Sequence, residues 1–147
     1  MKRRPPCWLV VTFSLLFASC ATVPVTSEHQ TADALQFQAE PGKAAIYIYG
    51  EGSLVGGSNK YPVFLDGHLL GNNGPGTFLA GSVSPGPHVI SAGVSQVMLT
   101  ATSGGIYFVR QTGHATASAA NNTTVRLISP DEGKKGVREC KQAASNF

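Results

Sequence analysis

The sequence predicts an all-β protein, built as a single antiparallel β-sandwich of seven or eight short strands. Segments rich in β-branched and aromatic residues recur at roughly ten-residue spacing, with turn residues between them. All but two of the 17 glycines lie between Gly42 and Gly113. This disfavours long helices, because each glycine in a helix interior costs about 1 kcal/mol. Strand-like and helix-like segments do not alternate, so a parallel sheet is not expected.

The expected strands, in chain order, cover residues 43–49, 60–65, 68–71, 76–83, 88–94, 96–102, 106–112 and 123–129. In the first of them, Ile46 and Ile48 alternate with Tyr47 and Tyr49, so the strand should have two distinct faces. Pro62 cannot donate a ladder hydrogen bond, so the second strand should begin there or lie at an edge.

Turn residues connect these segments. Asp66-Gly67 is a strong signal for a two-residue type I′ hairpin turn between the second and third strands. The sequence "SPGPH" (84–88) should turn the chain into the fifth strand. The sandwich domain is expected to cover residues 40–130, and the polar tail at 131–147 should hold a helical turn or two and fray.

The N-terminus has the pattern of an export signal, expected over residues 1–19. Three basic residues are followed by an apolar run from Cys7 to Phe17, which is shorter than the roughly 20 residues that span a bilayer. The sequence "FASC" ending at Cys20 resembles the bacterial lipobox, with Phe17 in place of the usual Leu. Cys20 is therefore the predicted lipid-attachment site; the alternative is an ordinary signal cleaved after Ala21.

Residues 20–39 are small, polar and proline-punctuated, as in a flexible tether. Two or three acyl chains on Cys20 would anchor the protein stably in a lipid bilayer, whereas one chain binds only marginally. In bacteria with two membranes, an Asp after the lipidated cysteine commonly retains a lipoprotein at the inner membrane. Ala21 stands there, so we expect the outer membrane.

The charge balance argues against nucleic-acid binding. The full chain carries 11 Lys and Arg against 8 Asp and Glu, a net charge of +3. Three of the basic residues, and no acidic residue, belong to the expected signal, so the exported chain has no net charge. No nucleic-acid partner is therefore expected.

No residue pattern indicates catalysis, a cofactor or a metal. The sequence lacks Gly-x-Ser-x-Gly, His-x-His and Cys-x-x-Cys motifs. Asp66 is explained by its turn, whereas Asp131 and Glu132 lie in the polar tail. His68 and His88 could meet across strands, and the ring of His88 can pack on turn residues. We therefore expect no enzyme, with no catalytic, cofactor-binding or metal-ligating residue.

Two further features leave alternatives open. Cys140 is the one cysteine without an assigned fate, so it is a free tail thiol or forms an intermolecular disulfide. Tyr47, Tyr49 and Tyr107 alternate with aliphatic or aromatic neighbours. They either form a second packed face or converge on an exposed aromatic patch that binds sugar or a partner strand.

Four segments in a fixed order carry a family resemblance: "EPGKAAIYIY" (40–49), "VFLDGHLLG" (63–71), "SPGPHVISAG" (84–93) and "GGIYFVRQTG" (104–113). They resemble PEGA-type small β-sandwich modules and, more closely, the bacterial lipoprotein family called domain of unknown function 2846, to about residue 141. The resemblance implies a transthyretin-like or immunoglobulin-like sandwich attached to the membrane through Cys20, and it transfers no catalytic residue.

The sequence therefore predicts a non-catalytic, membrane-anchored lipoprotein of the bacterial cell envelope. It would serve as a binding or assembly module, with an envelope protein or a glycan as the possible partner. The alternative is a surface carbohydrate-binding or adhesin-like module, which needs exposed, coplanar aromatic rings. An accessory subunit of an envelope enzyme is a third hypothesis, and it needs a pocket holding two titrating groups.

Overall fold

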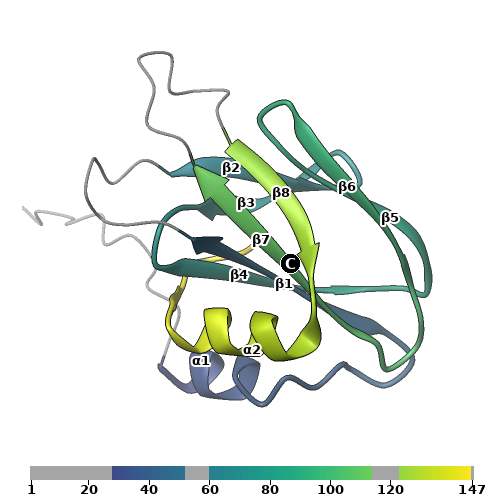
Figure 1. Ribbon diagram of the computed structural model, residues 1–147. Coiled ribbons are helices and arrows are strands. Elements are labelled where there is room, and N and C mark those ends of the chain that lie inside the picture. Colours follow the sequence, from purple (N-terminus) through teal and green to yellow (C-terminus); the bar gives the residue numbers. More distant parts are fainter. Residues whose placement is uncertain (1–27, 52–59, 114–122, 147) are drawn as a thin grey trace, which may run out of the picture.

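The computed structural model describes residues 28–51, 60–113 and 123–146. Within these ranges the protein is mainly β, with nine strands in two sheets and two short helices (Figure 1). The elements are α1 (Glu28–Ala34), β1 (Ala44–Glu51), β2 (Tyr61–Leu65), β3 (His68–Asn73), β4 (Thr77–Val83), β5 (Gly86–Ala92), β6 (Ser95–Ala101), β7 (Ile106–Gly113), β8 (Thr123–Ile128), α2 (Pro130–Arg138) and β9 (Lys141–Gln142). All eight predicted strands are present with ends within two residues, and β9 is additional.

The two sheets have the strand orders β8-β7-β1-β4-β9 and β3-β2-β5-β6. The expectation of purely antiparallel strands is wrong, because β1 pairs with β7 in parallel (Ala45 opposite Ile106) and β4 pairs with β9 in parallel. A parallel pair is usually recognised by a helix between its strands. Here the chain returns from β1 to β7 through β2 to β6, so that pattern is missing.

Strand β1 is the centre of the five-stranded sheet and is buried on both faces. Ile46 and Ile48 belong to a large buried cluster on one face, whereas Tyr47 and Tyr49 belong to a second cluster on the other. The period-two alternation of a strand separates the two sets. Every residue from Ala44 to Gly50 is buried, so β1 positions both halves of the core.

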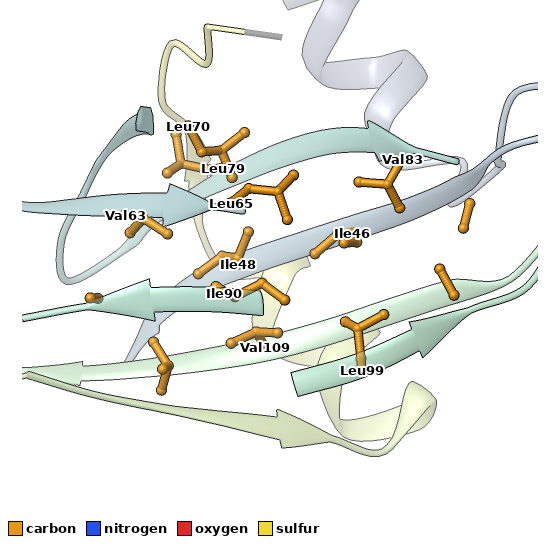
Figure 2. Packing of buried hydrophobic residues seen from close by; sticks show 14 residues of the cluster. Ile46, Ile48, Val63, Leu65, Leu70, Leu79, Val83, Ile90, Leu99 and Val109 are labelled. Carbon is orange, nitrogen blue, oxygen red and sulfur yellow. The ribbon is translucent and has the colours of Figure 1, made fainter. Parts of the chain in front are cut away.

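The larger cluster takes its side chains from both sheets. Figure 2 shows Ile46, Ile48 and Val109 of the five-stranded sheet near Ile90 and Leu99 of the four-stranded sheet. All five are at most 7% exposed. Burying each such side chain contributes about 1.5–3 kcal/mol relative to leaving it in water, so this shared cluster holds the two sheets together.

The second cluster lies on the opposite face of the five-stranded sheet and includes Val137 of α2. Figure 1 shows helices α1 and α2 lying side by side next to this sheet. The rings of Phe37, Tyr47 and Phe108 meet with centroids 5.2–5.5 Å apart. The Tyr47 hydroxyl donates to the carbonyl of Ala34 at 2.9 Å, and the Arg138 guanidinium lies 5.1 Å from the centre of the Phe37 ring. Residues 34–39 therefore pack on the sheet through Ala34, Phe37 and their neighbours, which corrects the expectation of a flexible tether as far as residue 39.

The predicted polar tail is also ordered. Pro130 lies in the first turn of α2, where its missing N–H costs nothing, and acidic residues early and basic residues late suit the helix dipole. Val137 is fully buried, and Gly133 and Gly136 bring the helix backbone against Phe108 and Tyr49. The expectation of fraying is therefore wrong. The polar sequence of the tail hid this, because Gly133 and Gly136 pack the helix through their backbone and only Val137 adds a buried apolar side chain.

The residues after α2 cross from one sheet to the other. The amide of Ala143 donates to the Phe78 carbonyl in β4 at 2.8 Å, and the amide of Asn146 donates to the Leu70 carbonyl in β3 at 2.8 Å. Ser145 also forms an isolated bridge to Gly71. This C-terminal strap, residues 141–146, therefore ties the five-stranded sheet to the four-stranded sheet.

The predicted hairpin between β2 and β3 is confirmed. Leu65 pairs with His68 across the two-residue loop. The loop residues Asp66 and Gly67 have φ of 51° and 81°, the positive values that a type I′ turn requires. No helix of the described residues is long and apolar enough to cross a membrane.

Candidate functional site

The predicted lipid site, Cys20, lies outside the described residues, as do Cys7, Ala21 and His114. The candidate site within them is a cleft of about 360 Å³ between the carboxyl end of β1 and helix α2, called here the β1–α2 cleft. Clefts of 300–1,000 Å³ commonly hold small ligands. Three glycines line it together with larger side chains, which are Tyr49, Glu51, Glu132, Lys135, Glu139 and Cys140.

Arg110 forms ion pairs with two acidic residues of the cleft lining, Glu51 and Glu132. Its Nε lies 3.3 Å from a carboxylate oxygen of Glu51, and its Nη1 lies 2.8 Å from a carboxylate oxygen of Glu132. The Arg110 side chain is 25% exposed and the two carboxylates are half-exposed. Such pairs contribute less than about 1 kcal/mol each to stability. Their effect here is to fix two acidic groups from β1 and α2 at the cleft.

Neither nucleophilic side chain in the cleft is activated. Burial raises the pKa of the Cys140 thiol, and the nearby charge of Glu139 raises it further. Burial also raises the pKa of Tyr49, with Arg110 opposing the shift and Glu132 and Glu51 adding to it. A reactive cysteine needs a lowered pKa, so the cleft keeps these groups protonated at neutral pH.

A second polar cluster lies at the turn between β2 and β3. The Nδ1 atom of His88 is 2.6 Å from Asp66 Oδ2, and its Nε2 atom is 2.7 Å from the carbonyl oxygen of Ser84. The amide of Val89 donates to Asp66 Oδ1 at 2.8 Å. The ring of His88 thus packs on turn residues, as predicted, but its contacts are to Asp66 and Ser84 rather than to His68.

The described residues hold no group of three or more His, Cys, Asp or Glu side chains placed to bind a metal ion. Cys140 lies just after α2, is half-buried in the lining of the cleft, and has no disulfide partner within the part of the chain that the structure describes. Asp131 and Glu132 were both expected in a solvated tail. Asp131 is exposed on α2, whereas Glu132 forms an ion pair with Arg110.

The three tyrosines do not converge. Tyr47 and Tyr49 are 3% and 5% exposed and belong to the second cluster. Tyr107 pairs in parallel register with Ile46, so it lies on the opposite face and packs on the large cluster. Its hydroxyl accepts a hydrogen bond from the Thr102 amide and donates one to the Thr100 carbonyl, at the edge strand β6. The packed-face alternative is therefore correct for Tyr47 and Tyr49, and the shared exposed patch is wrong.

Sequence reasoning missed a buried amide network beneath the carboxyl end of β1. Asn73 Nδ2 donates to Gln111 Oε1 at 2.9 Å, and the Thr77 hydroxyl donates to Asn73 Oδ1 at 2.7 Å. Both amide residues are at most 1% exposed. The Gln111 Nε2 atom is buried without a partner among the described residues, beside a void of about 10 Å³. The sequence feature that could have indicated this network is the turn segment "NNGPGT" (72–77), because Asn73 and Thr77 stand on either side of the turn.

Comparison with known proteins identifies the family of this chain. Residues 40–124, more than half of the chain, match the family model described as "Protein of unknown function (DUF2846)". The chain belongs to this family. The match stops before α2, so the closing segment to residue 141, included in the sequence resemblance, lies beyond it.

The chain is also similar to a bacterial protein over most of its length. An "Uncharacterized protein" of Haemophilus influenzae is 30% identical over 142 residues, which cover 93% of this chain and 83% of the relative. No solved structure matches.

Proposed function

We propose that this protein is a non-catalytic lipoprotein of the bacterial cell envelope, anchored through acylated Cys20, whose β domain binds or assembles with an envelope partner. The observation that carries the binding role is the β1–α2 cleft, which is of ligand size and has two carboxylates held in place by Arg110. The observation that supports the anchor is the lipobox-like "FASC" at residues 17–20.

The geometry favours binding over catalysis in this proposal. Both ring nitrogens of His88 are occupied, one by Asp66 and one by a backbone carbonyl, so this histidine offers no free base to a nucleophile. The raised pKa values of Tyr49 and Cys140 leave the cleft without an activated nucleophile. The cleft does hold several titratable side chains, which is what the accessory-subunit hypothesis requires, so that hypothesis stays the second candidate.

Carbohydrate binding receives less support than a protein or assembly partner. Sugar-binding surfaces use exposed aromatic faces, and Tyr47 and Tyr49 are buried in the second cluster. We further propose that the two sheets form a transthyretin-like or immunoglobulin-like sandwich. The buried cluster shared by both sheets supports this arrangement. An experimental structure in which the two sheets share no core would refute it.

The anchor is tested by mass spectrometry of the N-terminal peptide from membranes. The expected peptide begins at Cys20 and carries acyl chains, whereas Cys20→Ser should remain unprocessed or become soluble. Cys140→Ser is the matched control and should keep the lipid. An unmodified N-terminus at Thr22 would refute the lipoprotein. With Ala21 after the cysteine, density-gradient fractionation should place the protein in the outer membrane.

The binding role is tested with a photo-crosslinking residue in the cleft. A probe at Glu139, which lines the cleft, should form an adduct of defined mass in living cells. The same probe at exposed Thr100 on β6 is the control and should not form it. Equal adducts from both positions, or none from Glu139, would contradict binding at the cleft while leaving the lipid anchor unaffected.

A further inference from the structure

His88 lies between two turns that are distant in sequence. Asp66 is the first residue of the β2–β3 turn, and Ser84 follows β4 on the way to β5. Both ring nitrogens face oxygen atoms, at 2.6 Å and 2.7 Å. A carbonyl oxygen and an ionised carboxylate only accept hydrogen bonds, so both nitrogens can donate only when the ring is the doubly protonated imidazolium.

We propose that His88 is a pH-sensitive clip: its imidazolium form ties the β2–β3 turn to the segment between β4 and β5, and its neutral form releases one of the two contacts. A neutral ring has one lone pair that must face an oxygen. If the remaining proton stays on Nε2 against Ser84, the Nδ1 lone pair faces the Asp66 carboxylate, and that contact becomes repulsive.

The charges around the ring favour the protonated clip. Partial burial by itself lowers the pKa of His88, but the hydrogen bonds to Asp66 and the Ser84 carbonyl, with the Asp66 charge, outweigh it and raise the pKa. The Asp66 pKa is held below its usual value: burial opposes this, whereas the Val89 amide, His88 and the charge of His68 produce it. From β6 the residue opposite His88 is Leu99, which carries no charge.

The direction of the pH effect follows from these shifts. The stabilisation from His88 is fully present below its unfolded pKa of about 6.5 and is lost as pH rises through the raised folded pKa. The stabilisation from Asp66 is present above its unfolded pKa of about 3.9 and is lost as pH falls through the lowered folded pKa. The clip is therefore closed from about pH 4 to 6.5 and opens above the folded pKa of His88.

Opening is local in this proposal. Asp66 keeps two contacts with β5 that do not involve the ring, since its amide donates to the Val89 carbonyl at 2.9 Å and its Oδ1 accepts from the Val89 amide. The hairpin therefore stays attached. Gly86, Pro87 and His88 stay paired with Ala101, Thr100 and Leu99 of β6, so the freedom is gained only by the two connecting residues, Ser84 and Pro85.

The test is an NMR titration of the histidine ring carbons in the exported protein, kept in detergent. The His88 midpoint should lie above 6.5, and the amide signals of Gly67 and Ser84 should move with the same midpoint. Asp66→Asn keeps a residue that tolerates positive φ and should lower the midpoint by about one pH unit. Asp66→Gly is the second variant, in case the first folds poorly.

His68→Gln is the matched control, because His68 acts on the pair only through its charge. It should leave the coupling of the Gly67 and Ser84 signals to His88 intact. A wild-type midpoint at or below 6.5 would overturn the proposal. So would equal midpoints in wild type and in both Asp66 variants, or Ser84 signals that do not respond to the titration of His88.

Discussion

Gly136 of helix α2 lies directly against the ring of Tyr49 in β1, with no room for a Cβ atom between them. Gly133 has the same relation to Phe108 in β7. These two contacts set the height of the helix above the five-stranded sheet. They also place Glu132 and Lys135 on the rim of the β1–α2 cleft.

Gly136→Ala is expected to destabilise the domain by about 1–3 kcal/mol, the usual cost of overpacking a core. The intrinsic helix preference of alanine acts in the opposite direction, by about 1 kcal/mol. Urea unfolding should therefore show a lower midpoint for the protein, while a peptide of residues 128–140 should become more helical. A raised midpoint in the protein would mean that α2 is not docked on Tyr49.

Gly67→Val tests the turn between β2 and β3. Gly67 has φ of 81°, and a Cβ built on it meets no atom within 4 Å. Any loss of stability therefore comes from backbone strain, which is about 1–3 kcal/mol for such a residue. Gly67→Asn is the control, since Asn tolerates this region and should cost less. Equal denaturation midpoints for Gly67→Val and wild type would exclude a tight turn here.

Asn73→Ala tests the buried amide network. It leaves the Gln111 carbonyl oxygen and the Thr77 hydroxyl without their Asn73 partner, so the free energy of unfolding should fall by about 1–3 kcal/mol. Asn72→Ala changes the exposed neighbour on the same strand and should have an effect within about 0.5 kcal/mol. Similar losses for both variants would contradict a structural role of the network.

Cys140 should react slowly with alkylating reagents. Burial and Glu139 raise its pKa, so less thiolate is present at pH 8 than in an unfolded chain. Mass spectrometry of the Cys140 peptide should show slower modification by iodoacetamide in the native protein than in urea. Glu139→Gln removes the nearby charge and should increase the native rate. Equal rates in native and unfolded protein would contradict this environment.

The sequence predicted the strands well because each carries its own signal. Alternating residues such as Ile46 and Tyr47 identify a strand, and Asp66-Gly67 identifies the turn that closes a hairpin. The pairing of β1 with β7 depends instead on contacts between distant segments. No local pattern encodes that choice, so the parallel pair was not foreseen.

The candidate site was less predictable than the fold. Arg110 is one basic residue in a strand and Glu132 one acid in a polar segment, and only the docking of α2 brings them together. That docking depends on Gly133 and Gly136, which resemble helix breakers in the sequence. His88 was located near turn residues, but its second partner is a backbone carbonyl, which no sequence pattern marks.

The central position of β1 has a consequence for how the protein folds. β1 is the first strand made, yet both of its neighbours, β4 and β7, come much later in the chain. Contacts between residues so far apart give a high contact order, and such proteins fold in milliseconds to seconds rather than microseconds. The apolar strand "AAIYIY" can therefore gain its first neighbour only after β4 has been made, and its second only after β7 follows.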